Sequence, residues 1–151
     1  LYSYDGADTA NVHNTTVANA GYYGIYVASG NANVINTIVS GSNGGYGLLS
    51  VNNARVNHTH NLIHGFPSPY YATAGSETEV LNNPRFANPT SGDFHLAKGS
   101  PAINAGTDLS GVLREDLEGT PRPAYNVFEI GAYEYPDPSG SFRVLTWNEQ
   151  R

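Results

Sequence analysis

Three histidines lie close together in the middle of the chain, in the stretch His58-Thr59-His60 followed by His64. In a β-strand, His58 and His60 would project from the same face, and two imidazoles at that spacing can hold Zn²⁺ if a third ligand is present. No carboxylate lies nearby in the sequence to support such a site. We therefore expect these histidines to decorate the outer face of a strand or to bond to turn carbonyls, and we expect no metal or other cofactor.

Aromatic residues form the second group that could do chemistry. Six tyrosines are the candidates for one binding face: Tyr22, Tyr23, Tyr26, Tyr46, Tyr70 and Tyr71. Flat rings beside Asn and Ser donors suit the stacking of sugars. The alternative is that some of these rings point inward and the others form a ladder that simply covers a β-surface.

Carboxylates, the usual groups for polysaccharide cleavage, are scarce in the first half of the chain. Such enzymes need two acids that flank a groove, or acids that hold Ca²⁺ beside a basic residue. Residues 1–75 offer only Asp5, Asp8 and Arg55. A later charged cluster consists of Arg114, Glu115, Asp116 and Glu118. We expect this cluster to be a solvated turn in which Asp116 forms a structural ion pair with Arg122, so the chain has no evident catalytic site.

The overall composition excludes several classes of protein. The chain has 151 residues, no cysteine and a formal net charge of −6, which argues against nucleic acid as a partner. No apolar run approaches the roughly 20 residues that span a bilayer, so we expect no membrane insertion. The sequence also lacks methionine, from which we expect the chain to be a fragment or a processed product of a longer protein.

An internal repeat of about 22 to 23 residues runs through the first half. Residues 9–30, 31–53 and 54–66 align so that equivalent positions hold similar side chains. The aligned columns are Val12, Val34 and Val56; Asn14 and Asn36; Val17 and Val39; Tyr23 and Tyr46; Gly24 and Gly47; and Ile25 and Leu48. Short β-branched runs broken by Asn, Gly and Ser are typical of short strands joined by turns.

The repeat predicts an all-β fold, a short right-handed parallel β-helix of about three coils with an irregular C-terminal cap. Only two leucines occur in residues 9–53, which disfavours a leucine-rich repeat. In a β-helix, equivalent residues stack directly above one another. We assign residues 1–66 to the coils and residues 67–151 to a loop and a capping region of the same single domain. The first coil would present unpaired strand edges, so we expect self-association through the N-terminal coil.

The second half lacks the repeat but contains recognisable phrases. These are "NLIHG", "NNPRFANPTSGDFHLAKGSPAINAG", the D-x-x-G-x-x-R-P stretch of Asp116, Gly119, Arg122 and Pro123, and "EIGAYEY". They resemble the C-terminal end of bacterial extracellular right-handed β-helix proteins of the pectate-lyase-like class, often called choice-of-anchor Q proteins. That family usually has Asp where this chain has Asn104 and Glu129, which we interpret as polar exchanges in turns.

The resemblance implies a β-helix whose last coil is sealed by this region. We expect these structural residues to close the open end of the solenoid: Phe86, Phe94, Leu96, Ile103, Asp116, Arg122, Ile130 and Tyr133. It also implies an extracellular or cell-surface location in a bacterium and a polysaccharide as partner. The functional hypotheses are a glycan-binding part of a polysaccharide-associated protein, a non-catalytic adhesive module that self-associates, or the remnant of a polysaccharide lyase or glycoside hydrolase.

Overall fold

The computed structural model describes residues 9–41, 44–125 and 127–136, and nine of its strands wind into three stacked coils. The first coil contains β1 (Thr9–His13), β2 (Thr16–Ala20) and β3 (Tyr23–Val27). The second contains β4 (Asn31–Ile35), β5 (Ile38–Gly41) and β6 (Tyr46–Ser50). The third contains β7 (Arg55–Thr59), β8 (Leu62–His64) and β9 (Ser68–Tyr71).

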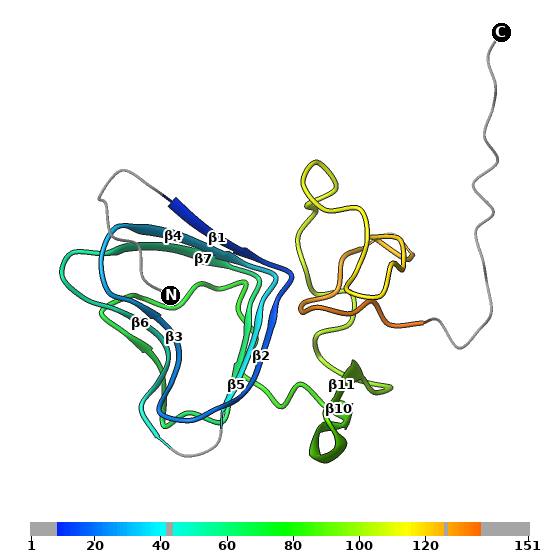
Figure 1. The fold of residues 1–151 in the computed structure, drawn as a ribbon, viewed down its shortest axis with the longest axis horizontal. Coiled ribbons are helices and arrows are strands. Elements are labelled where there is room, and N and C mark those ends of the chain that lie inside the picture. Colours follow the sequence, from blue (N-terminus) through cyan, green and yellow to red (C-terminus); the bar gives the residue numbers. More distant parts are fainter. Residues whose placement is uncertain (1–8, 42–43, 126, 137–151) are drawn as a thin grey trace, which may run out of the picture.

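Equivalent strands of the three coils pair in parallel and form three sheets. Sheet A is β1-β4-β7, sheet B is β2-β5-β8 and sheet C is β3-β6-β9. In Figure 1 the coils overlap one another and enclose a common interior. The described residues contain no α-helix. The predicted all-β class and the short right-handed β-helix of three coils are therefore confirmed.

Asparagine shapes the corner between sheets A and B. Asn14 and Asn36 adopt positive φ angles of 40° and 51°, and His60 takes the same place in the third coil with a φ of 51°. Asn tolerates this left-handed backbone better than most residues, because its short polar side chain bonds locally. The Nδ2 of Asn36 donates to the Oδ1 of Asn14 at 3.3 Å, so the predicted stacking of these two residues is confirmed.

The repeat is less regular than the sequence alignment predicted. The predicted pairs Val12 with Val34, Val17 with Val39, Tyr23 with Tyr46 and Ile25 with Leu48 all occur. The predicted alignment of Val56 with Val34 was wrong. Val56 pairs with Ala32, and His58 pairs with Val34. The outward asparagines show why. Asn33 bonds to Asn11, 22 residues earlier, whereas Asn57 bonds to Asn33, 24 residues earlier, so the second coil is longer.

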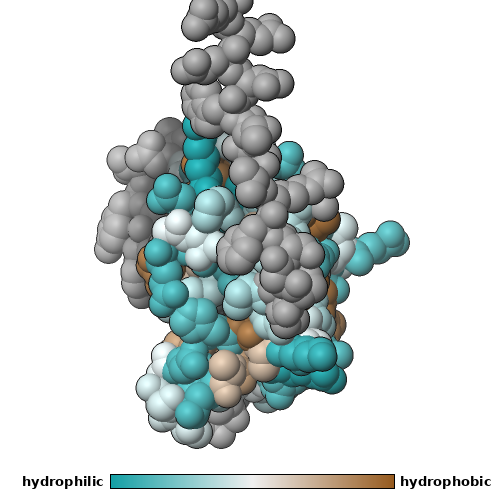
Figure 2. Space-filling view, turned by 90° about the vertical axis from the view of Figure 1, so that its right-hand side faces the viewer, coloured by the Kyte–Doolittle hydropathy of each residue, from teal (hydrophilic) through white to brown (hydrophobic). Residues whose placement is uncertain are grey.

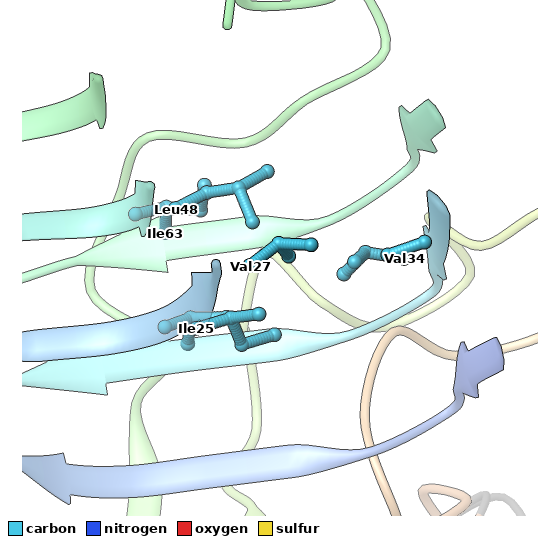
Figure 3. Packing of buried hydrophobic residues seen from close by; sticks show 7 residues of the cluster. Ile25, Val27, Val34, Leu48 and Ile63 are labelled. Carbon is cyan, nitrogen blue, oxygen red and sulfur yellow. The ribbon is translucent and has the colours of Figure 1, made fainter. Parts of the chain in front are cut away.

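The interior of the coils is a column of aliphatic side chains, several of which are labelled in Figure 3. Its fully or nearly buried members are Ile25, Val27, Ala32, Val34, Val39, Leu48 and Ile63. Strand alternation places every second side chain inside, and stacking places each one above its counterpart. Burial of this column is the main source of stability of the coils.

The C-terminal region packs beside the coils, and this corrects the predicted cap. Residues 86–136 lie on the outer side of β2 and β5 in Figure 1. Figure 2 views the molecule from this side, where most of the coloured surface is hydrophilic. The region contains the antiparallel pair β10 (Phe86–Asn88) and β11 (Asp93–Leu96), joined by a 3-10 turn at Pro89–Ser91. Leu96, Ala102 and Ile130 form a second core with Ile38 and Leu62 of sheet B.

All eight residues predicted to seal the solenoid belong to this lateral region. Phe86 and Ile103 are half-buried against the second core. The rings of Phe86 and Phe94 pack in a T-shaped arrangement with their centroids 5.3 Å apart. The Tyr133 ring lies 4.1 Å from that of His95. The structural reason is that Ile38 and Leu62 point outward from sheet B, opposite to Val39 and Ile63, and need a cover of their own.

Two asparagines attach the lateral region to the coils. The side chain of Asn36 donates to the carbonyl of Thr107 and accepts from its N–H, both at 2.8 Å. The Nδ2 of Asn14 donates to the carbonyl of Glu129 at 3.0 Å, and the N–H of Gly131 donates to the carbonyl of Asn36 at 2.8 Å. The corner asparagines thus bend the backbone and bind the second half of the chain.

Candidate functional site

Five of the six predicted tyrosines gather on the side of sheet C. We call this set the tyrosine surface: Tyr22, Tyr23, Tyr26, Tyr46 and Tyr71. The ring of Tyr23 lies 4.7 Å from that of Tyr22 and 5.7 Å from that of Tyr26. The rings of Tyr23 and Tyr46 are almost parallel, at 6° and 6.4 Å, and Tyr46 lies 4.8 Å from Tyr71. Each ring contacts at least one other, so the surface is continuous.

The stacking of coils positions these rings. Tyr23 pairs with Tyr46 across β3 and β6. Tyr26 pairs with Leu49, and Leu49 pairs with Tyr71 of β9. Leu49 itself is only 4% exposed. A parallel ladder holds its strands about 4.8 Å apart, which places successive rings at contact distance without any loop to hold them.

Three tyrosines of the tyrosine surface are exposed to solvent and two are half-buried. Tyr22 is 63% exposed, Tyr71 47% and Tyr23 43%, whereas Tyr26 and Tyr46 are half-buried. Exposed large aromatic side chains that touch one another are uncommon unless they bind something. Their apolar faces and polar hydroxyl edges are the combination that a sugar ring recognises.

Tyr70, the sixth candidate, lies elsewhere. Tyr70 of β9 pairs with the buried Leu48 of β6, and its side chain packs against the interior core. Its hydroxyl donates to Glu79 Oε2 at 2.5 Å, and its ring stacks 5.5 Å from that of His58. Burial, with the adjacent Glu79 carboxylate, raises the pKa of Tyr70 well above its usual range. Tyr70 is therefore part of the closed third coil and not of the tyrosine surface.

His58, predicted on the outer face, lies inside the third coil, and this corrects its assignment. Its Nδ1 lies 2.8 Å from Glu79 Oε1 and its Nε2 lies 3.0 Å from Thr73 Oγ1. Asn61 also donates to Glu79 Oε1, at 2.8 Å. The side chains of His58 and Glu79 are 4% and 1% exposed. These residues form a hydrogen-bonded polar layer beneath the aliphatic column.

Glu79 is the centre of this layer and was missed by the sequence analysis. Burial alone would raise the pKa of a carboxyl group, but hydrogen bonds from His58, Tyr70 and Asn61 more than offset burial and lower the pKa of Glu79. The segment that carries Glu79 also extends sheet B, because Val80 pairs with Leu62 in parallel. The end of the coils is thus closed by residues 70–80, not by the lateral region.

The three histidines do not come together. His60 occupies the corner, where its Nδ1 lies 2.8 Å from the Thr59 hydroxyl, and His64 lies at the end of β8 on another face. Both ring nitrogens of His58 are already occupied. In the part of the chain that the structure describes, no three His, Asp or Glu side chains are arranged to hold a metal ion.

The predicted ion pair of Asp116 with Arg122 was wrong. Arg122 Nη1 lies 2.9 Å from Glu134 Oε1, with both side chains almost fully buried, and Arg122 Nη2 donates to the carbonyl of Gly131. Asp116 instead accepts backbone N–H groups from Glu118, Thr120 and Glu134.

Glu129 lies beside this pair and differs from the turn residue that the sequence predicted. It is 1% exposed, and its Oε2 has no hydrogen-bond partner in the described residues when it is ionised. Burial and a hydrogen bond with Glu134 raise the pKa of Glu129 to about 9. A proton held on Glu129 lets it donate to Glu134, which also contacts Arg122 and the N–H of Ala124, so the two neighbouring carboxyl groups are not both charged.

The carboxylates named for catalysis lie partly outside the described residues and partly in the lateral region. Asp5 and Asp8 lie outside the described residues. Glu118 Oε2 lies 3.2 Å from His95 Nε2 in the lateral region. Glu79, Glu129 and Glu134 are buried. The described part of the site therefore offers aromatic binding groups and no pair of accessible acids beside them.

Comparison with protein families agrees with this geometry. A family model described as a right-handed β-helix region matches residues 3–99, which include all three coils and the β10–β11 pair. The chain belongs to this family. Searches of curated proteins and of solved structures found no match to this β-helix chain. Among the described residues, none forms a helix that is long and apolar enough to cross a membrane.

Two features of this β-helix could have been found from its sequence. Ile38-Val39 and Leu62-Ile63 are adjacent apolar pairs in strands where apolar and polar residues should alternate, which signals that both faces are covered. Asn11, Asn33 and Asn57 also form an outward ladder, at 2.8 and 3.3 Å, that reveals the true spacing of the third coil. Glu79 carried no such signal, because its partner His58 is 21 residues away.

Proposed function

We propose that this chain is the glycan-binding part of a polysaccharide-associated β-helix protein, with the tyrosine surface as its binding site. The observation that carries the proposal is the continuous contact of five tyrosine rings on one side of the coils. Three of these rings are more than two-fifths exposed. Sugar rings present apolar C–H faces and polar edges, and they pair with aromatic faces and hydroxyl groups of this kind.

The form of the surface supports a polymer rather than a small molecule. Small ligands occupy concave pockets, whereas the tyrosine surface is the outer side of a sheet. The first 75 residues carry almost no charge, so attraction to an ionic ligand contributes little to binding there. A neutral glycan chain that lies across successive coils is the partner that fits these properties best.

The wider setting remains part of the same proposal. The phrases of the second half that resemble choice-of-anchor Q proteins support an extracellular or cell-surface role in a bacterium. Catalysis by a polysaccharide lyase or glycoside hydrolase would need accessible acids that flank the bound glycan. Glu79 at the end of the coils is buried, and Glu115 and Asp116 line a cavity with the first coil that includes none of the five tyrosines. Glycan binding without cleavage is therefore the function that we assign to this part of the protein.

A second candidate, self-association, is supported by a separate observation. In the described residues, β1, β2 and β3 each pair with a strand on one side only. Ala10, Val12 and Val17 of this first coil are half-buried against the core. Unpaired strand edges are templates for another chain. Sedimentation of the chain at high concentration tests this candidate: association supports it, and a clean monomer contradicts it.

A panel of glycans tests the main proposal. We expect xylan, the least charged member of a panel with the acidic glycans pectin and alginate, to quench tyrosine fluorescence saturably and to raise the melting temperature of the chain, because a ligand that binds only the native state stabilises it. A panel that left both the fluorescence and the melting temperature unchanged would remove the support for glycan binding.

A further inference from the structure

A second concave site lies on a different side of the molecule. A cleft of about 450 Å³ separates the outer face of sheet B from the loop that leads into β10. Asn19, Ser40 and His64 line it, one from each coil, and Ser40 pairs directly with His64 in the ladder. Asn83 and Arg85 line the opposite wall. The volume is in the range of a small-molecule site.

The charge of this cleft is opposite to that of the chain. The whole protein carries a formal net charge of −6, yet the residues that line the cleft include one arginine and no carboxylate. Arg85 has no ion-pair partner among the described residues. A guanidinium without a carboxylate partner, in a concave site with no acid, attracts an anion.

Arg85 is exposed, and hydrogen bonds of its backbone and of its side chain orient it. Arg85 adopts a left-handed φ of 51°, a costly conformation for a residue with a long side chain. Its N–H donates to Asn83 Oδ1 at 2.7 Å, and its carbonyl accepts from the N–H of Ala97 at 2.8 Å. Its Nη1 donates to the carbonyl of Gly99 at 3.0 Å. One edge of the guanidinium is thereby fixed, and its other donors remain for a ligand.

The facing wall supplies further polar groups. Within the described residues, His64 has no hydrogen-bond partner, although it is half-buried. The hydroxyl of Ser40 and the amide of Asn19 likewise form no side-chain hydrogen bond in this part of the chain. Asn19 is exposed to water, whereas half-buried polar side chains such as those of Ser40 and His64 are normally paired. An imidazole, a hydroxyl and an amide that line the same cleft as this guanidinium form a set suited to the oxygens of an anion.

We infer that this cleft is an oxyanion site that binds the carboxylate or sulfate group of a small ligand. Arg85 supplies the charge and a directed donor, because its planar fork matches the spacing of two oxygens of such a group. Ser40 and His64 contact the ligand from the coils. The site is independent of the tyrosine surface, since it lies on sheet B and uses none of the tyrosines. Failure of glycan binding therefore leaves it untouched.

Nuclear magnetic resonance of the full chain tests the assignment. Sodium sulfate and sodium acetate are titrated separately against sodium chloride at constant ionic strength, while the ring signals of the histidines and the Nε–H signals of the arginines are followed. We expect saturable shifts at His64 and Arg85, and the tighter of the two salts identifies the preferred anion. The Arg85→Gln and His64→Gln variants should each weaken binding at least about tenfold, the usual value of a lost charge-assisted hydrogen bond.

The controls separate a built site from general attraction of anions. Arg114→Gln makes the same change of charge at an exposed arginine outside the cleft, and should alter the affinity less than about twofold. If Arg85→Gln fails to fold because it loses the bond to Gly99, Arg85→Lys and Ser40→Ala replace it, and each should weaken binding. Shifts that never saturate with either salt, or equal affinity in His64→Gln and the wild type, would overturn the inference.

Discussion

His58 occupies in the third coil the interior position that Val34 occupies in the second. The aliphatic column therefore ends in an imidazole, whose nitrogens lie 2.8 Å from Glu79 and 3.0 Å from Thr73. A solenoid that stopped on a valine would expose an apolar surface to water. The polar layer of His58 and Glu79 ends the column with hydrogen bonds instead, and residues 70–80 supply most of the partners.

Replacement of His58 by valine should destabilise the chain, although valine is the residue of the coil above. The buried Glu79 carboxylate would lose one of its hydrogen-bond partners, and a buried polar group left without its partner costs about 1 to 3 kcal/mol, or more when it is charged. The free energy of unfolding in urea measures the effect. His64→Val, on the outer side of the same coil, is the matched control and should cost less than about 1 kcal/mol. Similar values for the two variants would show that the polar layer does not support the fold.

Acid should weaken the same layer through Glu79. The pKa of Glu79 is lowered in the folded chain from its ordinary value of 4.5, so the contribution of Glu79 to stability is complete above that value and is lost as the pH falls through the lowered pKa. Urea unfolding between pH 6 and pH 3 should therefore show a decline that is shallower in Glu79→Gln. An equally steep decline in that variant would assign the acid sensitivity to other groups.

Glu129 should act in the opposite direction. The pKa of Glu129 is raised to about 9 in the folded chain, whereas it is 4.5 in the unfolded chain. Its contribution to the free energy of unfolding is therefore complete below pH 4.5 and is lost as the pH rises toward 9, at about 1.4 kcal/mol per pH unit. Glu129→Gln keeps a donor for Glu134 at every pH. We expect this variant to exceed the wild type in stability at pH 8 and to match it more closely at pH 5, by urea unfolding at both values. A wild type that is the more stable protein at pH 8 would contradict a protonated Glu129.

The two asparagine ladders provide a matched pair of variants. Asn36→Asp removes the donor to Thr107 and Asn14 and places a charge at a fully buried position, which should cost more than about 2 kcal/mol. Asn33→Asp makes the same change in the outward ladder, where water can replace the lost bond, and should cost less than about 1 kcal/mol. Thermal unfolding of both variants measures the difference. Equal losses would mean that Asn36 does not attach the lateral region.

The period and the class of fold could be predicted because a β-helix repeats its chemistry in every coil. Val12 with Val34, Asn14 with Asn36 and Tyr23 with Tyr46 all follow from one spacing. The same regularity misplaced His58. Val56, two residues before His58, continued the apparent valine column in the sequence. The second coil is two residues longer than the first, so His58 and not Val56 pairs with Val34. A shift of two residues keeps the alternation of inward and outward side chains, so the alternation did not reveal it.

The site and the lateral region were predictable only in part. Adjacent tyrosine positions in successive repeats indicate a shared surface, but Tyr70 turns inward because its ring covers the polar layer. The buried charges of the lateral region depend on contacts between segments without a repeat. Arg122 pairs with the buried Glu134, and Asp116 accepts backbone N–H groups instead, which spacing along the chain does not indicate.

Tyr46 gives the most direct test of the account, because its ring lies between those of Tyr23 and Tyr71. Isothermal titration calorimetry compares the full chain, Tyr46→Ala and the control Tyr133→Ala, whose ring belongs to the lateral region, against the glycan that binds best in the panel. We predict saturable binding by the wild type, a loss of at least about tenfold in Tyr46→Ala and less than about twofold in Tyr133→Ala. Equal affinity of Tyr46→Ala and the wild type, with both chains folded, would contradict a glycan site on the tyrosine surface.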